Sequence, residues 1–347
     1  MQTPAITVTG HSQLDAWRNK VLPPVELIRP GLLSIPVTFP GNPMRYTLCY
    51  ALFDQAQCLI IDPGFNSDEG LTQIQAGLST VGLGFSDVTG VISTHFHIDH
   101  LGLARRVADL SKAWVALGEN ELRHLSSYEN AHDEVRLDQA RMASWGVPAE
   151  RVPEAAMSVR SLEDLKALAD PDLRLAHDET LTIAGRTLRV AATPGHTPGH
   201  ICLWDESGAL LFAGDHLLPR ISPNVSLEIR GDADPLRNNI HSLRLIAQNN
   251  DFEVLPAHEY RFSGVADRAE VLLQHIDERS AEVQQVLSSG ASTVYDVARQ
   301  LSWSRGWDSL GGVQFRLALS ETAAHLQYLA TEGIHPAVPG LPESVSS

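Results

Sequence analysis

The fold of this chain is decided by residues 94–102, which read Thr-His-Phe-His-Ile-Asp-His-Leu-Gly. This stretch follows a short apolar run, so we expect a loop that begins where a buried strand ends. Imidazole nitrogen and carboxylate oxygen suit Zn²⁺ and similar divalent cations. In an extended loop His95 and His97 point the same way, while Asp99 and His100 can turn toward a second point. The segment can therefore serve two metal ions.

Three further apolar runs lead to a residue of the same ligand type. His196, Asp215 and His258 each stand at or just past the end of such a run, beside or close to glycine or proline. Binding sites gather at strand ends in layered α/β sheets. Each segment alone is also compatible with an ordinary turn. Together with the first loop they supply seven ligand-type residues.

The surrounding sequence, from about residue 30 to 260, alternates short apolar runs with helical patterns. This alternation indicates an α/β layered domain. The expected strands are Tyr46–Phe53, Cys58–Ile61, Val91–Thr94, Leu188–Ala192, Ile201–Trp204, Leu210–Ala213 and Val254–Leu255, and the expected helices include Leu71–Leu78 and Leu101–Leu110.

Two regions read as helical. The first is an insert at about 119–176, and the second begins at about 265, with further helices starting near Thr293 and Gly312. We expect a catalytic domain over 1–262 and a small, mostly helical C-terminal domain over 263–347. The last dozen residues read as a loose tail.

Composition narrows the function. The chain has 347 residues, of which 43% are hydrophobic, and 26 basic against 42 acidic side chains give a net charge of −16. Such a chain supports a large core, but its field does not attract nucleic acid or an anionic membrane. Without a visible signal or membrane segment, and with three cysteines in apolar contexts, we expect a cytoplasmic protein with buried free thiols.

These residues resemble the metallo-β-lactamase superfamily, whose signature is H-x-H-x-D-H followed by a His, a bridging Asp and a last His. The resemblance covers about residues 30–262 and implies an αββα sandwich with two divalent metal ions, Zn²⁺ being favoured and Fe or Mn the alternatives. It also implies the roles of the ligands. One ion is bound by His95, His97 and His196, the other by Asp99, His100 and His258, with Asp215 as the bridge, while Asp62 supports the metal loop from outside the ligand set.

The ligand set also separates branches of the superfamily. Penicillin-hydrolysing members usually replace the bridging Asp, and flavodiiron relatives carry Glu at the position of His97. The intact set resembles the glyoxalase II, lactonase and nuclease branches. It implies a binuclear hydrolase of a small-molecule thioester, ester or lactone, in which a metal-bridging hydroxide attacks and Asp99 or Asp215 accepts the proton.

Two other functions stay open at this point. One is a metal-dependent ribonuclease or phosphodiesterase, and the other is a non-enzymatic, metal-bound regulator. The C-terminal region resembles a winged-helix-like domain of some relatives, but residues 263–347 carry five Arg, no Lys and ten acids. A nucleic-acid arm should be basic. Packing on the catalytic domain or on a partner in a homodimer is favoured, and glutathione as the leaving group is disfavoured for want of basic residues.

Further residues are candidates for roles around the metals. His200 is expected to hold a loop by a hydrogen bond. The helical insert either caps the pocket or packs on itself. The candidate substrate contacts are His216, Asn224, Tyr260 and Arg261 near the ligands, and Tyr128, His132, Met142 and Trp145 in the insert.

Overall fold

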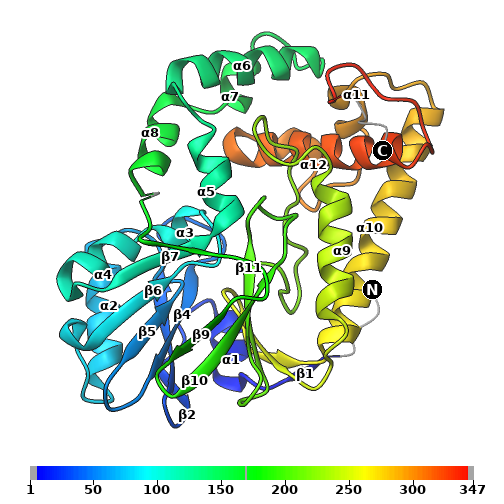
Figure 1. The fold of residues 1–347 in the computed structure, drawn as a ribbon. Helices are drawn as coiled ribbons and strands as arrows, with labels where there is room; N and C mark the ends of the chain where they lie inside the picture. The colour runs from blue at the N-terminus through cyan, green and yellow to red at the C-terminus, as the bar shows by residue number, and fades with distance from the viewer. Residues whose placement is uncertain (1–5, 169, 343–347) are drawn as a thin grey trace.

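The computed structural model describes residues 6–168 and 170–342, and in them two seven-stranded sheets pack face to face (Figure 1). Helices cover both outer faces. This αββα sandwich confirms the expected fold class.

The first sheet is formed by the N-terminal half of the chain. Its order is β2 (Glu26–Arg29), β3 (Leu32–Thr38), β4 (Tyr46–Phe53), β5 (Cys58–Ile61), β6 (Val88–Ile92), β7 (Trp114–Gly118) and β8 (Leu173–Leu175). From β5 onward neighbouring strands are parallel, so their carboxyl ends lie at one edge. The second sheet has the order β1 (Thr7–Val8), β14 (Phe262–Ser263), β13 (Glu253–Pro256), β12 (Leu210–Gly214), β11 (Ile201–Asp205), β10 (Arg186–Ala192) and β9 (Thr180–Ile183).

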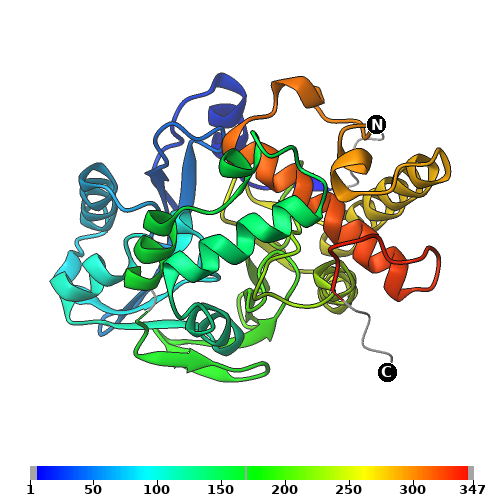
Figure 2. The same ribbon diagram turned by 90° about the horizontal axis from the view of Figure 1, so that it is seen from above.

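The helices lie outside the sandwich or cross its upper end. They are α1 (His11–Asn19), α2 (Asp68–Ser79), α3 (Ile98–Leu101), α4 (Ala104–Ser111), α5 (Glu119–Ser126), α6 (Ala131–Ser144), α7 (Val152–Ala155), α8 (Val159–Leu168), α9 (Pro235–Ile246), α10 (Val265–Ser288), α11 (Val294–Ala298) and α12 (Gly312–Thr331), with 3₁₀ turns at Phe85–Asp87 and Trp307–Ser309. Seen from above, α6 and α12 lie across the top of the molecule (Figure 2).

The position of strand β4 in the sandwich explains why its sequence is apolar throughout. Alternate side chains of a strand point to opposite faces of the sheet. Tyr50 and Leu52 face the core between the sheets, while Cys49 and Ala51 pack under the outer helices. Both faces are therefore buried. The continuous apolar runs made this strand predictable, whereas the short edge strands β8 and β9 have no comparable pattern.

The helical insert and the C-terminal helices share one hydrophobic core with the second sheet. Trp145, which follows α6, Leu272 from α10 and Phe315 from α12 belong to the same buried cluster as Trp204 from β11. Through residue 342 no strand follows Ser263. The C-terminal region therefore lacks the β-hairpin of a winged helix, in contrast to the expected resemblance.

The structure also shows where the C-terminal segment and the three cysteines lie. The indole Nε1–H of Trp145 donates to the carbonyl of Gly340 at 3.0 Å, so part of the expected loose tail is docked; residues 343–347 lie outside the described residues. Cys49, Cys58 and Cys202 are free and buried. Among the described helices, none combines the length and the apolar character needed to cross a membrane.

Candidate metal centre

The seven ligand-type residues meet at one end of the sandwich because each follows a strand. The segment from His95 to His100 follows β6 and continues into α3, and His196 follows β10. Asp215 comes directly after β12, and His258 comes two residues after β13. Residues far apart in the chain are thus fixed by the backbone of two packed sheets.

Three histidines form the first group. His95 Nε2 lies 2.9 Å from His97 Nδ1, and His196 Nε2 lies 3.1 Å from the same Nδ1 atom. These three nitrogens lie within 4.8 Å of one another. They therefore face a common point.

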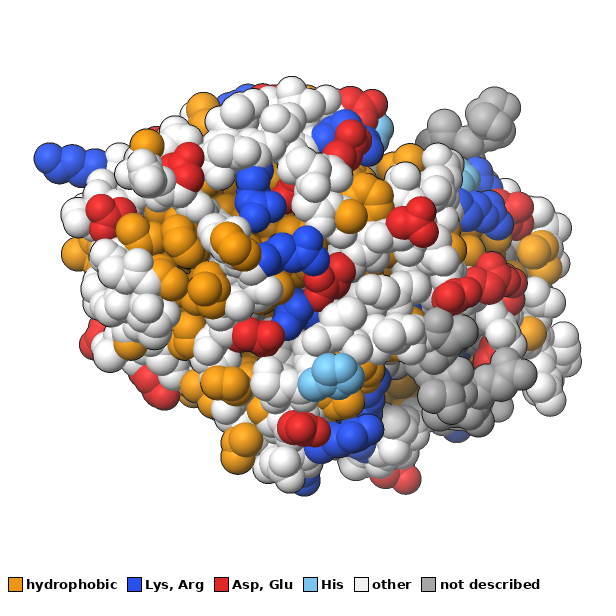
Figure 3. All heavy atoms as spheres, turned by 90° about the horizontal axis from the view of Figure 1, so that it is seen from below, with side chains coloured by type: hydrophobic (Ala, Val, Ile, Leu, Met, Phe, Trp, Pro, Cys, Tyr) orange, Lys and Arg blue, Asp and Glu red, His pale blue; other side chains and the backbone are white. Residues whose placement is uncertain are grey.

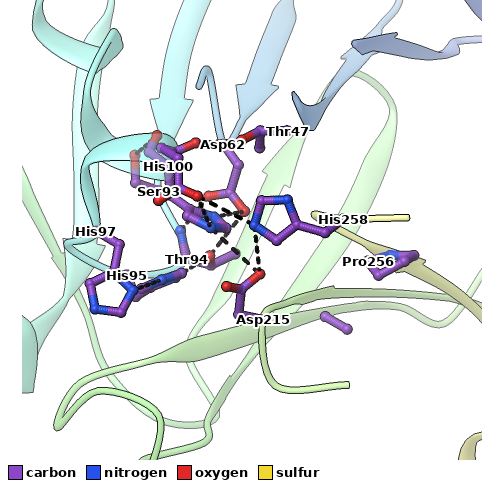
Figure 4. Close-up of polar contacts among 12 residues, drawn as sticks. Thr47, Asp62, Ser93, Thr94, His95, His97, His100, Asp215, Pro256 and His258 are labelled. Atoms are coloured by element: carbon purple, nitrogen blue, oxygen red, sulfur yellow. Dashed lines mark hydrogen bonds and ion pairs between the residues drawn. The ribbon is translucent and has the colours of Figure 1, made fainter. Parts of the chain in front are cut away.

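A second group lies beside the first, and one carboxylate faces both (Figure 4). His258 Nε2 is 3.4 Å from Asp99 Oδ2, and His100 Nε2 is 4.0 Å from that oxygen. Asp215 Oδ1 lies 3.3 Å from His258 Nε2 and 3.5 Å from His100 Nε2. The other oxygen of Asp215, Oδ2, lies 3.6 Å from His196 Nε2. The carboxylate of Asp215 thus stands between the two groups.

The donor set fits divalent cations. In the described part of the chain, both ring nitrogens of His100 and Oδ1 of Asp215 are buried and make no hydrogen bond of normal geometry. Buried polar atoms are rarely left without a partner. Burial lowers the pKa of His97 to about 3, which keeps the imidazole in the neutral form that binds metal. A cation between His100 and Asp215 would supply the partner that His100 Nε2 and Asp215 Oδ1 lack, while His100 Nδ1 faces Asp62.

The acidic side of the centre is ionised. Burial raises the pKa of Asp215, but His258 and His100 outweigh burial and hold that pKa well below its usual range. For His258 burial acts in the other direction and lowers the pKa. The carboxylates of Asp215 and Asp99 outweigh burial and raise the pKa to about 10. The site thus attracts positive charge, whether protons or metal ions.

Backbone carbonyls set the tautomers of two ligands. His196 Nδ1 donates to the carbonyl of Asn224 at 2.7 Å, and His258 Nδ1 donates to the carbonyl of Tyr46 at 2.9 Å. Because a carbonyl can only accept, Nδ1 carries a proton in both rings, and Nε2 is the nitrogen that faces the centre and can bind a metal ion. Both rings are therefore oriented for metal binding.

Asp62 contacts the metal loop through both of its carboxylate oxygens. Its Oδ1 accepts the Thr94 amide at 2.7 Å, and its Oδ2 accepts the Thr94 hydroxyl at 2.9 Å and lies 3.1 Å from His100 Nδ1. The carboxylate thus holds both the start of the loop and one ligand ring.

His200 lies below Asp215. Its Nε2 accepts the amide of Asp215 at 3.2 Å, so Nδ1 carries the proton and donates to the Thr193 hydroxyl at 2.8 Å. Gly214 makes this contact possible, because it has a φ of +50° and a Cβ there would lie 2.6 Å from His200 Nε2. His200 therefore positions the bridging residue.

Glu121, from α5, is a further residue of the centre, and no motif in the sequence marks it. Its fully buried carboxylate accepts the amide of Phe96 at 3.2 Å, the amide of Gly199 at 3.1 Å and the hydroxyl of Thr197. Burial raises its pKa to about 7, although the three hydrogen bonds lower it. Glu121 thus ties the loop that carries His97 to the loop beyond β10.

Above the ligands lies a pocket of about 510 Å³, bordered by His97, Asp99, His196, Asp215 and His258. Among the candidate substrate contacts, Asn224 lines this pocket. His216 lines an adjacent cavity of about 260 Å³ between the C-terminal helices and the loop after β12.

The other candidate contacts lie elsewhere. Arg261 is buried and paired with Glu26 at 2.6 Å and Glu253 at 2.5 Å, and Tyr260 is buried outside the pocket lining. Tyr128 is buried beside His124, at 3.3 Å from its Nε2. The insert residues Tyr128, His132, Met142 and Trp145 are absent from the pocket lining. Of the two alternatives for the insert, the structure favours packing over capping, because Tyr128, Met142 and Trp145 are buried among the helices and do not line the pocket.

The comparisons with known proteins agree with this geometry. The sequence model of the metallo-beta-lactamase superfamily matches residues 43–258, a range that holds all seven ligand-type residues. The chain belongs to this superfamily. A solved metallo-beta-lactamase family protein from Thermus thermophilus is 30% identical, with a TM-score of 0.73 over 88% of this chain and 95% of that one. Superfamily membership implies divalent metal ions at the centre.

Two relatives bear on the class of reaction. The chain is similar to the probable metallo-hydrolase YqjP of Bacillus subtilis (strain 168), with 28% identity over 79% of this chain and 84% of the relative. It is 30% identical to a hydroxyacylglutathione hydrolase of Rhizobium meliloti (strain 1021), but this match covers 35% of this chain and 46% of that enzyme. The comparisons therefore indicate a metallo-hydrolase.

Proposed function

We propose that this protein is a binuclear metal-dependent hydrolase of a small-molecule thioester, ester or lactone. The observation that carries the proposal is the meeting of two ligand groups at the floor of one pocket, with Asp215 facing both. The imidazole and carboxylate donors favour Zn²⁺, with Fe and Mn as alternatives. The partial likeness to hydroxyacylglutathione hydrolase supports the thioester among the three substrates.

When bound, the two cations would lower the pKa of a water molecule and polarise the carbonyl group of the substrate. The residues of the chain hold the metal ligands in place and orient them. The carbonyls of Asn224 and Tyr46 accept hydrogen bonds from Nδ1 of His196 and His258 and so direct Nε2 of each ring toward the metal ions, and Asp62 and Glu121 fix the metal loop.

Two carboxylates are placed to handle the proton. Asp99 and Asp215 both line the pocket, and each side chain is 13% exposed. Either carboxylate can accept a proton from the attacking water and pass it to the leaving group. The mechanism needs no side-chain nucleophile.

The charge distribution favours this function over a nuclease. The net charge is −16, and no Lys or Arg is among the described residues that line the pocket. On the face seen from below, basic and acidic side chains are interspersed (Figure 3). A nucleic-acid site needs clustered basic residues. The buried free thiols further support a reducing compartment such as the cytoplasm.

The test is metal analysis followed by a substrate screen. Protein purified without chelator is expected to hold about two divalent ions per chain, and metal-loaded protein should hydrolyse a thioester, ester or lactone. Chelator should abolish the activity, and Zn²⁺ or Mn²⁺ should restore it. Substantially less than one ion per chain, or cleavage of phosphodiesters alone, would contradict the proposal.

A further inference from the structure

The first two turns of α12 form one wall of the pocket above the metal centre. Val313, Gln314 and Leu317 line it, and Val313 and Leu317 lie on one helix face because they are four residues apart. Val313 is 71% exposed and Leu317 is 37% exposed. Large apolar side chains left in water at the mouth of a pocket mark a surface that contacts a ligand.

The lining of the pocket contains further apolar residues besides those of α12. Met44, from the loop before β4, and Phe96, from the metal loop, line it together with Leu218 and Ile221 from the loop after β12. A chain of methylene groups that enters the pocket and contacts these residues would lose contact with water. Each buried methylene contributes about fourfold to binding.

The pocket offers no cation to an anionic substrate. Besides the ligands, the charged residues that line it in the described chain are Glu228 and Asp232. Glu228 is paired with Arg316 at 3.2 Å, whereas burial raises the pKa of Asp232. A phosphate or carboxylate held here would find no counter-charge apart from the metal ions, so the lining disfavours it.

The arginines nearest along the chain are engaged elsewhere. Arg45 donates to the carbonyl of Trp17 and lies 4.1 Å above its ring. Arg220 lies beside Glu259, at 3.9 Å. Arg230 is paired with Glu134. None of these three arginines borders the pocket.

The amino end of α12 does not provide an anion-binding group in place of these arginines. A free helix amino end attracts anions through its unpaired amides. The amide of Gly312, however, donates to Glu154 Oε1 at 2.8 Å, so an acidic side chain already occupies this end. The wall that α12 presents to the pocket is therefore apolar.

We propose that the pocket takes the apolar acyl or alkyl chain of an uncharged ester, thioester or lactone, and that Val313 and Leu317 contact this chain. The inference rests on the proposed hydrolase function and narrows it, because it excludes phosphate-bearing thioesters such as those of coenzyme A. Specificity for the chain then comes from the C-terminal region.

The experiment compares matched substrates on the metal-loaded full chain. Octanoyl and acetyl thioesters of N-acetylcysteamine share one uncharged leaving group, and octanoyl-coenzyme A presents the same thioester on a phosphate-bearing one. An ethyl ester and a δ-lactone, each with and without a long alkyl chain, complete the panel. We expect kcat/KM to rise about tenfold or more from acetyl to octanoyl, and to fall about tenfold or more from N-acetylcysteamine to coenzyme A.

The α12 wall is tested by Leu317→Ser and Val313→Ser, with Ile334→Ser as the control. Ile334 is 54% exposed, lies in the same C-terminal region and does not line the pocket. The long-chain to short-chain ratio should fall about fourfold in the two wall variants and stay unchanged in the control. Because Val313 is exposed, Val313→Lys should fold and should raise the relative rate with octanoyl-coenzyme A.

The outcomes separate the two proposals. Failure to hydrolyse any substrate of the panel overturns the hydrolase function itself. A higher kcat/KM for octanoyl-coenzyme A than for its uncharged counterpart overturns the substrate class and leaves the hydrolase standing. A chain-length ratio that stays unchanged in folded Leu317→Ser and Val313→Ser overturns the assignment of α12.

Discussion

The metal side of the pocket is built from loops that follow strands, whereas the facing side is built from α12. On the metal side the ligands are positioned by hydrogen bonds with neighbouring polar groups, as in the contacts of Asp62 with Thr94 and of His200 with Asp215. On the α12 side, Val313 and Leu317 offer exposed apolar surface. From this difference we infer that the loops at the strand ends carry out the chemistry. The shape and the apolar surface of α12 then select the substrate.

The largest effect should come from the metal side, at Asp215. Asp215→Ala removes the carboxylate that faces both ligand groups, so we expect loss of metal and a fall in kcat/KM of about 10³-fold or more. Metal content and hydrolysis of the best substrate are the measurements. Asp133→Ala, at an exposed position on α6, is the control and should behave as wild type. Full activity in Asp215→Ala would show that hydrolysis does not depend on this metal centre.

Glu121 tests whether the metal side depends on supports beyond its ligands. Glu121→Ala removes the acceptor that joins the Phe96 amide to the loop at Thr197 and Gly199, so metal affinity should fall about 10- to 100-fold. Competition with a chelator of known affinity measures it. Glu119→Ala, at an exposed position two residues earlier, should leave the affinity unchanged. Equal affinities in the two variants would reduce Glu121 to a packing role.

The same residue gives the metal side a pH dependence. Burial raises the pKa of Glu121 from 4.5 to about 7, so the folded protein binds its proton more tightly than the unfolded chain does. Its contribution to stability is fully present below pH 4.5 and is lost as the pH rises through 7.

Glu121→Gln removes this titration while keeping most of the side-chain volume. Between about pH 5 and pH 8, the free energy of unfolding of the wild type should therefore fall relative to that of the variant. Urea titrations of both proteins in the same buffers measure the difference. Parallel pH profiles would show that Glu121 does not titrate in this range.

The two sides also differ in how far the sequence predicts them. Each metal-side residue follows an apolar run, so the position of His196 or Asp215 is a local property of the chain. Glu121 escapes such reasoning, because its partners lie 25, 76 and 78 residues away along the chain. The helical pattern of α12 predicts an apolar face, but periodicity does not say which neighbour that face meets. The sequence therefore left open whether the insert caps the pocket, and it did not single out α12 as the element that lines it.

The smallest effect on catalysis should come from a substitution of Trp145, which tests whether the insert contacts the pocket. Its indole is fully buried in the core shared with the C-terminal helices, and its Nε1–H donates to the carbonyl of Gly340. Trp145→Phe loses this hydrogen bond and some ring contact, so the free energy of unfolding should fall by about 1–2 kcal/mol. Because Trp145 does not line the pocket, kcat/KM and the chain-length ratio should stay at wild-type values. A changed long-chain to short-chain ratio at unchanged stability would show that the insert contacts the substrate and that α12 only supports it.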